Sequence, residues 1–211
     1  MTAVSRRHEN KLVRSGFNLI AGVDEAGIGP LAGPVVAAAV IFIEGFKLKG
    51  LDDSKKLTPK KREQLCRKII ESAVTVGIGI VDSTIIDRIN ILQASLRAME
   101  SAVSSLSKKP NHVMIDGIRK VPGIKIPQTC IKHGDSLSHV IAAASVIAKV
   151  ARDNIMMEYD RIYPRYKFRE HKGYGTEVHI AALLKFGPSP IHRHSYEPVQ
   201  RAVFQKGIIS L

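Results

Sequence analysis

The stretch of sequence that most constrains the fold runs from residue 17 to residue 43, where two apolar runs flank a turn rich in glycine and proline. The first run covers 19–23 and ends in two adjacent carboxylates, Asp24 and Glu25, and the second run covers 35–43. Both runs have the length and the β-branched content of strands. This segment therefore predicts two neighbouring strands joined by a turn, with two acidic groups where the first strand ends.

The acid pair and the turn together indicate a particular chemistry. Neighbouring side chains of a strand point to opposite faces, so Asp24 and Glu25 can share one site only where the strand ends or bends. Gly27, Gly29 and Gly33 leave backbone amides open to close approach by a phosphate or a sugar. Two carboxylates beside such a turn suggest a hard divalent metal working on a phosphate ester. Taken alone, the pair is equally compatible with two solvated charges at a strand end.

The rest of the chain predicts an α/β fold with a mixed five-stranded sheet flanked by helices. Further strands are expected at 73–81, 112–117 and 126–131, helices at 59–72, 83–107, 136–159 and 177–186, and a helical or loose segment at 1–16. The composition shifts near Tyr163 and Pro164. That shift predicts a first domain at 1–160 and a small, basic, mainly helical C-terminal extension at 161–211 that packs on it.

Three of the five predicted strands end in acidic residues, namely Asp24 with Glu25, Asp116 and Asp135. Functional groups gather where the strands of such sheets end. Four like charges at one place would raise one another's pKa unless a cation lies among them. A ligand set made only of oxygen favours Mg²⁺ or Mn²⁺ over zinc, and two such ions can catalyse phosphodiester hydrolysis. The alternative is that each acid only caps a loop.

The charge balance points to a polyanionic partner. The chain holds 32 Lys and Arg against 19 Asp and Glu, a net charge of +13. An excess of this size favours nucleic acid, and the alternative is a charge that only serves solubility. No apolar stretch reaches the roughly 18 residues of a membrane span, so no membrane association is predicted. The polar N-terminus and the isolated cysteines Cys66 and Cys130 predict a cytoplasmic location.

Several motifs resemble those of the bacterial type 2 ribonuclease H family, ribonuclease HII. They are DEAGxGPLAGPVVAAAV, LDDSKKLT, IDG, a GD pair before SxxHxIAAASVIAKVxRD, HKGYGTxxH and GPSPIHRxS, in the family's order over residues 17–200. The resemblance implies an RNase H-like sheet followed by a C-terminal helical part. It also implies an endoribonuclease that cuts RNA in RNA–DNA hybrids and nicks 5′ to ribonucleotides embedded in duplex DNA, leaving a 3′-hydroxyl and a 5′-phosphate, as in ribonucleotide excision repair.

The same resemblance assigns roles to residues of this chain. Its catalytic, metal-binding acids match Asp24, Glu25, Asp116 and Asp135, which implies two divalent ions, Mg²⁺ or Mn²⁺. Its substrate contacts match Gly27, Ile28 and Gly29 at the turn that reads the ribose 2′-hydroxyl, Ser54, Lys55 and Lys56 in a phosphate-contacting loop, and Lys172 and Tyr174 in a loop that packs on deoxyribose. The alternatives from the residues alone are a solvated charge run for the lysines and a half-buried packing tyrosine.

One position departs from the family pattern. The family usually has arginine between the two glycines, and this chain has Ile28. The glycine backbone can still meet a 2′-hydroxyl, but a guanidinium contact to phosphate is lost. We therefore predict weaker substrate affinity with an unchanged reaction.

Other polar residues are assigned to structure. Asp153 is expected to form an Arg–Asp pair and not to act as a fifth ligand, and four histidines are expected to serve packing and capping, namely His139, His179, His192 and His194. Residues 200–204 match a clamp-binding peptide only in part, so the sequence does not support clamp binding. The predicted enzyme is a monomer. Its rivals are a junction resolvase, which would need no 2′-hydroxyl, and a non-catalytic nucleic-acid-binding protein.

Overall fold

The computed structural model describes residues 4–209 except residues 53 and 56, with a single mixed sheet at its centre. The strands are β1 (Ile20–Ala26), β2 (Val35–Ile41), β3 (Thr75–Val81), β4 (His112–Asp116) and β5 (Gln128–Ile131), in the spatial order β3-β2-β1-β4-β5. β1 pairs antiparallel with β2 and parallel with β4, β2 pairs antiparallel with β3, and β4 pairs parallel with β5. The predicted mixed five-stranded sheet is confirmed.

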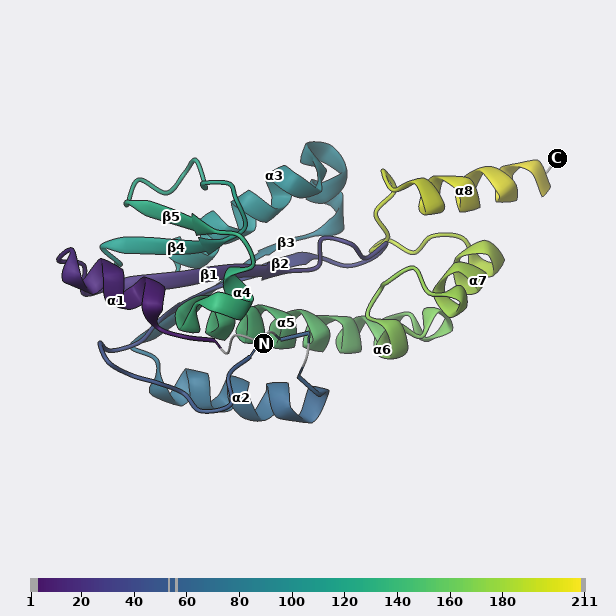
Figure 1. Ribbon diagram of the computed structural model, residues 1–211. Helices are drawn as coiled ribbons and strands as arrows, with labels where there is room; N and C mark the ends of the chain where they lie inside the picture. Colours follow the sequence, from purple (N-terminus) through teal and green to yellow (C-terminus); the bar gives the residue numbers. More distant parts are fainter. Residues whose placement is uncertain (1–3, 53, 56, 210–211) are drawn as a thin grey trace.

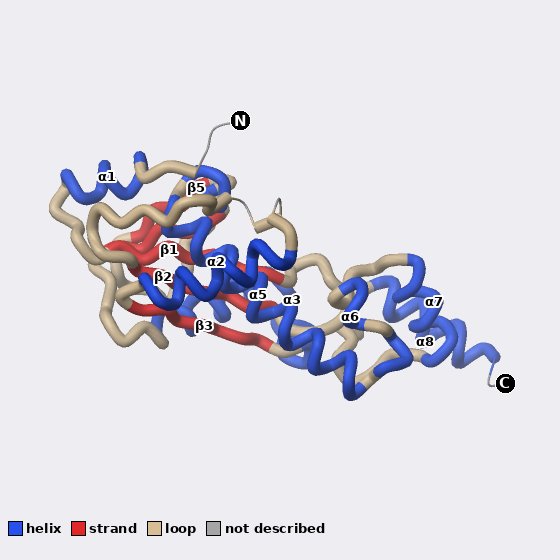
Figure 2. The backbone as a smooth tube through the Cα atoms, turned by 90° about the horizontal axis from the view of Figure 1, so that it is seen from below, coloured by secondary structure: helices blue, strands red, loops and turns tan. Residues whose placement is uncertain are grey.

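The helices cover both faces of this sheet (Figures 1 and 2). They are α1 (Arg7–Arg14), α2 (Pro59–Ser72), α3 (Ser83–Ser104), α4 (Gly134–Leu137), α5 (His139–Ile162), the 3₁₀ turn η1 (Pro164–Tyr166), α6 (Phe168–His171), α7 (Glu177–Phe186) and α8 (Glu197–Ile209). α3 packs on one face and α5 on the other, and α2 packs against α5. Among the described residues, no helix is both long and apolar enough to cross a membrane.

The ends of the helices follow from capping residues. Thr58 accepts a hydrogen bond from the amide of Lys61 at the start of α2, and Asp82 accepts one from the amide of Ile85 at the start of α3. The helix expected at 136–159 is wrong in one respect. Ser138 is extended and its hydroxyl caps α5, so the segment divides into α4 and α5.

Small residues allow the helices to lie close to the sheet. A methyl group added at Gly22 of β1 would lie 2.2 Å from the carbonyl carbon of Val140, so the backbone of α5 rests directly on β1. On the opposite face, a methyl group at Gly79 of β3 would lie 2.0 Å from the carbonyl oxygen of Ala98 in α3. These contacts set the distance between the sheet and the helix on each of its faces. The central strand β2 is buried along its whole length.

The chain after α5 forms a helical extension at one end of the sheet (Figure 1). It returns to the loop between β1 and β2, where the amide of Leu31 donates to the carbonyl of Gly173 at 2.8 Å and Ala32 forms an antiparallel bridge with His192. The division into a unit at 1–160 and an extension at 161–211 stays a proposal, and α5 runs across that boundary to Ile162.

Candidate active site

The pairing of β1 with β4 brings the first two acidic residues together. Val23 lies opposite Ile115 in this parallel register, so the next residues, Asp24 and Asp116, are neighbours on adjacent strands. Side chains alternate along a strand, and Met114 packs in the layer beneath α5. Asp24 and Asp116 therefore face α5, and burial of Asp24 is almost complete.

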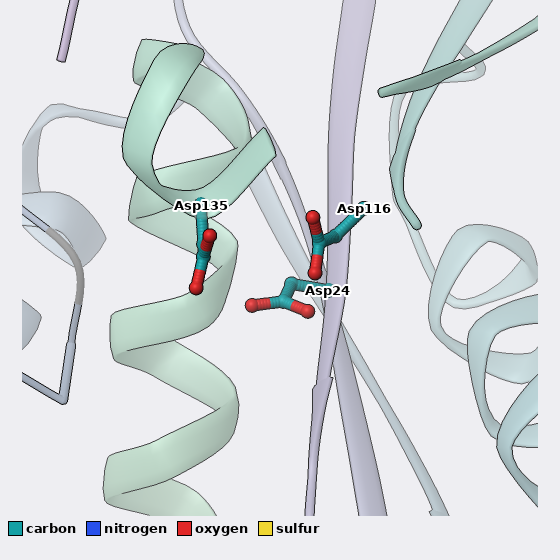
Figure 3. Close-up of side chains that lie close together, drawn as sticks. All are labelled: Asp24, Asp116 and Asp135. Atoms are coloured by element: carbon teal, nitrogen blue, oxygen red, sulfur yellow. The ribbon is translucent and has the colours of Figure 1, made fainter. Parts of the chain in front are cut away.

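Asp135 completes a three-carboxylate group at this position (Figure 3). It lies in α4, which follows β5 after a left-handed residue at His133. The amide of Gly134 donates to Oδ1 of Asp116 at 2.6 Å, which ties α4 to the end of β4. One carboxylate oxygen of each of Asp24, Asp116 and Asp135 lies within 4.8 Å of the other two.

Glu25 lies outside this group. β1 stays in register with β2 as far as Ala26, with Glu25 opposite Ala37, so the strand does not bend at the acid pair. Glu25 consequently points to the face that α3 covers. There it lines a cleft of about 210 Å³ together with Ile28 and Leu92, and Asp116, the last residue of β4, borders the same cleft at its edge. Its Oε2 atom is buried and has no hydrogen-bond partner within the described residues.

The electrostatics of the four acids call for a cation. Burial, followed by the charges of Glu25 and Asp116, raises the pKa of Asp24 well above its usual range. Burial and the charge of Asp116 raise the pKa of Glu25 from 4.5 to about 7, and burial and the charge of Asp135 raise the pKa of Asp116. Desolvated like charges of this kind are stabilised by a cation with a preference for oxygen. The donor set therefore fits a hard divalent metal.

The glycine turn adjoins these acids. Gly27 has a φ of +107°, and a methyl group there would lie 2.3 Å from Nε of Arg152, so the position requires glycine. Ile28 is 47% exposed and its side chain borders the cleft that contains Glu25. A methyl group at Gly29 would lie 3.9 Å from the ring of Tyr174. The structure thus brings the turn and the predicted stacking residue side by side.

Tyr174 has the surroundings of a stacking platform. Its side chain is 42% exposed, and Nζ of Lys149 lies 5.7 Å from the ring centroid. Lys172 is half-buried, and its ammonium group donates to the carbonyl of Arg169. Its own carbonyl accepts from Nη1 of Arg152 at 3.0 Å. Tyr174 is therefore open to a ligand, whereas the ammonium group of Lys172 is engaged within its own loop.

The residues of the predicted phosphate-contacting loop have different surroundings in the structure. Nζ of Lys55 lies 3.1 Å from Oδ2 of Asp135 and its side chain is exposed, whereas Lys56 lies outside the described residues. Ser54 is buried, and its hydroxyl lies 2.8 Å from the hydroxyl of Ser145, which hydrogen-bonds to the side chain of Asp24. The hydroxyl of Ser54 thus lies in the interior behind Asp24, and a phosphate contact of this loop residue stays a prediction.

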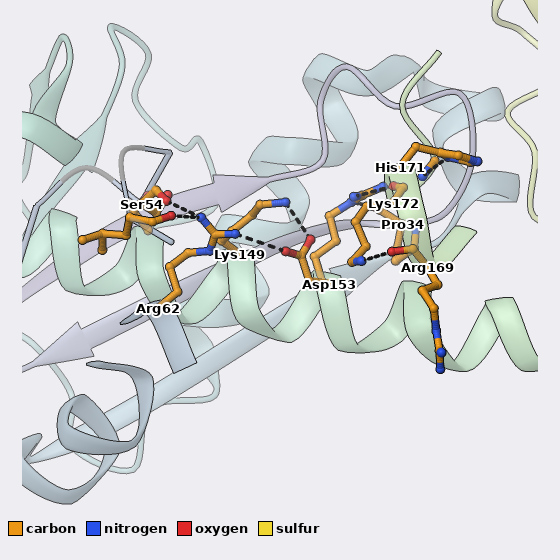
Figure 4. A network of polar contacts seen from close by, with 12 residues as sticks. Pro34, Ser54, Arg62, Lys149, Asp153, Arg169, His171 and Lys172 are labelled. Atoms are coloured by element: carbon orange, nitrogen blue, oxygen red, sulfur yellow. Dashed lines mark hydrogen bonds and ion pairs between the residues drawn. The ribbon is translucent and has the colours of Figure 1, made fainter. Parts of the chain in front are cut away.

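A row of polar contacts connects this loop to α5 and the extension (Figure 4). Nη1 of Arg62 donates to the carbonyl of Ser54 at 2.8 Å, and Nη2 of Arg62 lies 3.9 Å from Oδ2 of Asp153. The other oxygen of Asp153 lies 2.6 Å from Nζ of Lys149. Asp153 is thus held in structural ion pairs, as expected, although its neighbour Arg152 is not the partner.

The histidines also have structural partners. Nε2 of His179 lies 3.0 Å from Nε2 of His192, and Nδ1 of His192 accepts from the amide of Ser189 at 2.9 Å. Nε2 of His139 accepts from the amide of Leu48 at 2.8 Å. These bonds agree with the packing and capping roles predicted for His139, His179 and His192, and the role of His194 stays a prediction.

Two buried arginines were missed by sequence reasoning. Arg152 donates to the carbonyls of Pro34 and Ala32 at 3.0 and 3.1 Å, and Arg193 donates to three carbonyls of the same loop. Both lie inside family-like motifs. A backbone carbonyl as the partner of an arginine leaves no mark in the sequence, so no pattern signalled this role.

Comparison with known proteins decides the family. Residues 21–199 match the family model described as ribonuclease HII. The chain belongs to the ribonuclease HII family. A relative named ribonuclease HII in Geobacter metallireducens is 55% identical over 195 residues, 92% of this chain and 91% of the relative. Another in Acholeplasma laidlawii is 51% identical over 205 residues, 97% of this chain and 100% of the relative.

Solved structures agree with this assignment. The ribonuclease H2 of Pyrococcus horikoshii OT3 superposes with a TM-score of 0.78 at 26% identity, over 92% of this chain and 100% of that one. Bst-RNase HIII in complex with Mn²⁺ has a TM-score of 0.71 at 18% identity, over 90% of this chain and 71% of that one, and it shares the fold. As a ribonuclease HII family member the chain is a nuclease and a hydrolase, with ribonuclease H activity on RNA–DNA hybrids implied. The alternative of a non-catalytic binding protein is therefore wrong.

Proposed function

We propose that this ribonuclease HII nicks 5′ to ribonucleotides embedded in duplex DNA, in addition to cutting the RNA strand of RNA–DNA hybrids. The supporting observation is that three acids, Asp24, Asp116 and Asp135, converge within 4.8 Å next to the glycine turn. The products would carry a 3′-hydroxyl and a 5′-phosphate. This activity would place the enzyme at the first cut of ribonucleotide excision repair in the cytoplasm.

The four acids would hold two divalent ions, Mg²⁺ or Mn²⁺. Asp24, Asp116 and Asp135 would be ligands, and the unpartnered Oε2 of Glu25 supports a ligand role for that residue as well. When bound, two such ions supply an activated water and neutralise the charge that develops on the leaving 3′-oxygen.

The protein's own groups orient the acids. The amide of Gly134 fixes Oδ1 of Asp116, and Ser145, backed by Ser54, hydrogen-bonds to Asp24. Lys55 beside Asp135 adds a positive charge where a phosphate would approach. A preorganised arrangement of this kind spares the reaction the cost of reorienting dipoles.

Substrate selection would depend on the turn and on Tyr174. The backbone of Gly27, Ile28 and Gly29 would meet the ribose 2′-hydroxyl, and Tyr174 would pack on the neighbouring deoxyribose. A deoxyribonucleotide at the cleavage position lacks the hydroxyl and leaves the polar groups of the turn unpaired, which is the costly case in recognition.

A cleavage assay tests this proposal. Three end-labelled duplexes are incubated with Mg²⁺ or Mn²⁺: one all DNA, one with a single ribonucleotide and one RNA–DNA hybrid. We expect cutting of the hybrid and a nick 5′ to the single ribonucleotide, with no cutting when Asp116→Asn replaces the wild type. Cleavage of the all-DNA duplex would instead support a resolvase-like nuclease, and cleavage of the hybrid alone would refute recognition of embedded ribonucleotides.

A further inference from the structure

The underside of the glycine turn is held by one buried arginine from the distant end of the chain. Arg193 is fully buried, and its guanidinium donates to the carbonyls of Gly27, Ile28 and Gly33, at 2.9 Å for Ile28 and 3.1 Å for Gly33. Gly27 and Arg193 are 166 residues apart in the sequence. The conformation of the turn therefore depends on the C-terminal extension.

Tyr196 reinforces this contact. Its hydroxyl donates to the carbonyl of Ile28 at 3.0 Å and accepts from Nη1 of Arg193 at 2.9 Å. The guanidinium carbon of Arg193 lies 5.2 Å from the centroid of the tyrosine ring. The carbonyl of Ile28 thus accepts two hydrogen bonds from the extension. These two bonds fix the orientation of the central peptide of the turn.

The charge of Arg193 is not neutralised by a hydrogen-bonded acid. Among the described residues, all acceptors of its guanidinium are uncharged oxygens, and no carboxylate forms an ion pair with it. Burial lowers the pKa of Arg193, but a guanidinium stays protonated at neutral pH. A buried cation bonded to carbonyls polarises those peptide groups and adds positive potential on the amide side of the turn.

The amides of the turn are left for a ligand. Within the part of the chain that the structure describes, the amides of Gly27, Ile28 and Gly29 donate no hydrogen bond. Their neighbours do: Leu31 and Gly33 donate to the carbonyls of Gly173 and Ile191, both at 2.8 Å. The carbonyls of Gly27 and Ile28 are therefore directed to Arg193 and Tyr196, while their amides and that of Gly29 have no partner among the described residues.

We infer that Arg193 and Tyr196 are positioning residues that orient the amides of the turn toward the ribose 2′-hydroxyl, so that selection of ribose depends on the C-terminal extension. This inference rests on the function proposed above. It also explains how the turn can keep its shape with Ile28 at its centre. The cation that holds the turn is the guanidinium of Arg193 beneath it, and no charged side chain at position 28 is needed. Removal of the Tyr196 hydroxyl should therefore weaken discrimination more than it weakens general binding.

The test measures binding in an Asp116→Asn background, where no cleavage occurs. The readout is the ratio of Kd for an all-DNA duplex to Kd for the same duplex with one ribonucleotide. Tyr196→Phe should lower this ratio about 3- to 10-fold, as expected for loss of one oriented hydrogen bond. Arg193→Lys should lower it further, since an ammonium group cannot bond three carbonyls in the same fork geometry.

Tyr166→Phe is the matched control. The hydroxyl of Tyr166 is also buried in the extension and donates to the carbonyl of Gly187 at 2.7 Å, away from the turn. It should lower Tm by an amount similar to Tyr196→Phe and leave the Kd ratio unchanged. If the Kd ratio is retained in Tyr196→Phe, or falls equally in Tyr166→Phe, this inference is overturned and the proposed function is not affected. A background protein that binds both duplexes equally overturns the proposed ribose recognition and this inference with it.

Discussion

Asp116 is an example of a residue whose charge opposes folding of the metal-free protein. Burial is the main cause that raises the pKa of Glu25 from 4.5 to about 7, and the negative charge of Asp116 is the second cause. Between these values the folded state binds protons more tightly than the unfolded state. Protonation of Glu25 therefore stabilises the folded state fully below pH 4.5, and this stabilisation is lost as the pH rises through about 7. The metal-free enzyme should lose stability over this window.

Asp116→Asn should abolish nicking yet stabilise the metal-free protein at pH 8. The amide keeps an oxygen that can accept from Gly134, and one repelling charge disappears. We expect a gain on the order of 1–2 kcal/mol, or about 2–8 °C in Tm. Thermal unfolding in EDTA at pH 5 and pH 8 measures this, and the gain should shrink at pH 5. A lower Tm for the variant at pH 8 contradicts the argument from repulsion.

Ile28 gives a second prediction at the scale of one residue. Its side chain is 47% exposed, and its carbonyl is held by Arg193 and Tyr196, so Ile28→Arg should leave the backbone of the turn in place. The added guanidinium would supply the phosphate contact expected of the family arginine. We expect Kd to fall about 2- to 5-fold and the salt slope of log Kd to steepen by about 0.9. Ile28→Gln is the uncharged control, and no change in Kd or rate for the arginine variant would show that the prediction of weakened affinity is wrong.

At the scale of elements, close packing of strand and helix sets the frame of the site. Gly77 and Gly79 let α3 approach β3, and Gly22 lets α5 approach β1. α3 then provides Leu92 in the cleft beside Glu25, and α5 provides Ser145 behind Asp24. The acids are therefore fixed by layers whose separation depends on glycine.

Gly79→Ala should destabilise the protein although Gly79 is not one of the predicted site residues. The added methyl group would lie 2.0 Å from the carbonyl oxygen of Ala98, and backbone must move to make room. Overpacking of this kind costs about 1–3 kcal/mol. Urea unfolding measures the loss. Gly207→Ala, where the methyl group meets nothing within 4 Å, is the control and should be neutral or slightly stabilising. Equal stability of the two variants would contradict the packing argument.

At the scale of the whole molecule, the extension and the loop between β1 and β2 form one surface that carries the proposed substrate contacts. The turn between β1 and β2 is bonded to the segments around Gly173 and Ile191, so Tyr174 cannot move far without the turn. The net charge of +13 then acts on the phosphates of either strand without regard to the sugar. Affinity and ribose selection should therefore be separable.

Salt titration tests this separation. Raising the salt from 50 to 200 mM should weaken binding of an all-DNA duplex and of a ribonucleotide-containing duplex in parallel, since each phosphate contact contributes a slope of about 0.9 in log Kd against log salt. The ratio of the two Kd values should stay within about 2-fold, because the 2′-hydroxyl is uncharged. A ratio that falls steeply with salt would show that ribose selection depends on phosphate contacts.

Much of this protein was determined by local sequence. Apolar runs of strand length, apolar residues at helical spacing and an acid after each of three strands predicted the sheet, the long helices that pack on it and the convergence of Asp24, Asp116 and Asp135. These features are readable because the periods of strands and helices are set over a few residues. Family motifs then assigned the acids to metal and the turn to ribose.

Only the tertiary structure decided which groups meet. The unbroken register of β1 and β2 turned Glu25 to the opposite face from Asp24, and packing against Ser145 placed the hydroxyl of Ser54 in the interior. The bonds of Arg193 to the turn join residues 166 apart. Their acceptors are backbone carbonyls, which every residue carries, so no sequence pattern distinguishes them. Such contacts follow from how the layers and the extension pack, because burial of a guanidinium requires acceptors wherever the fold brings them.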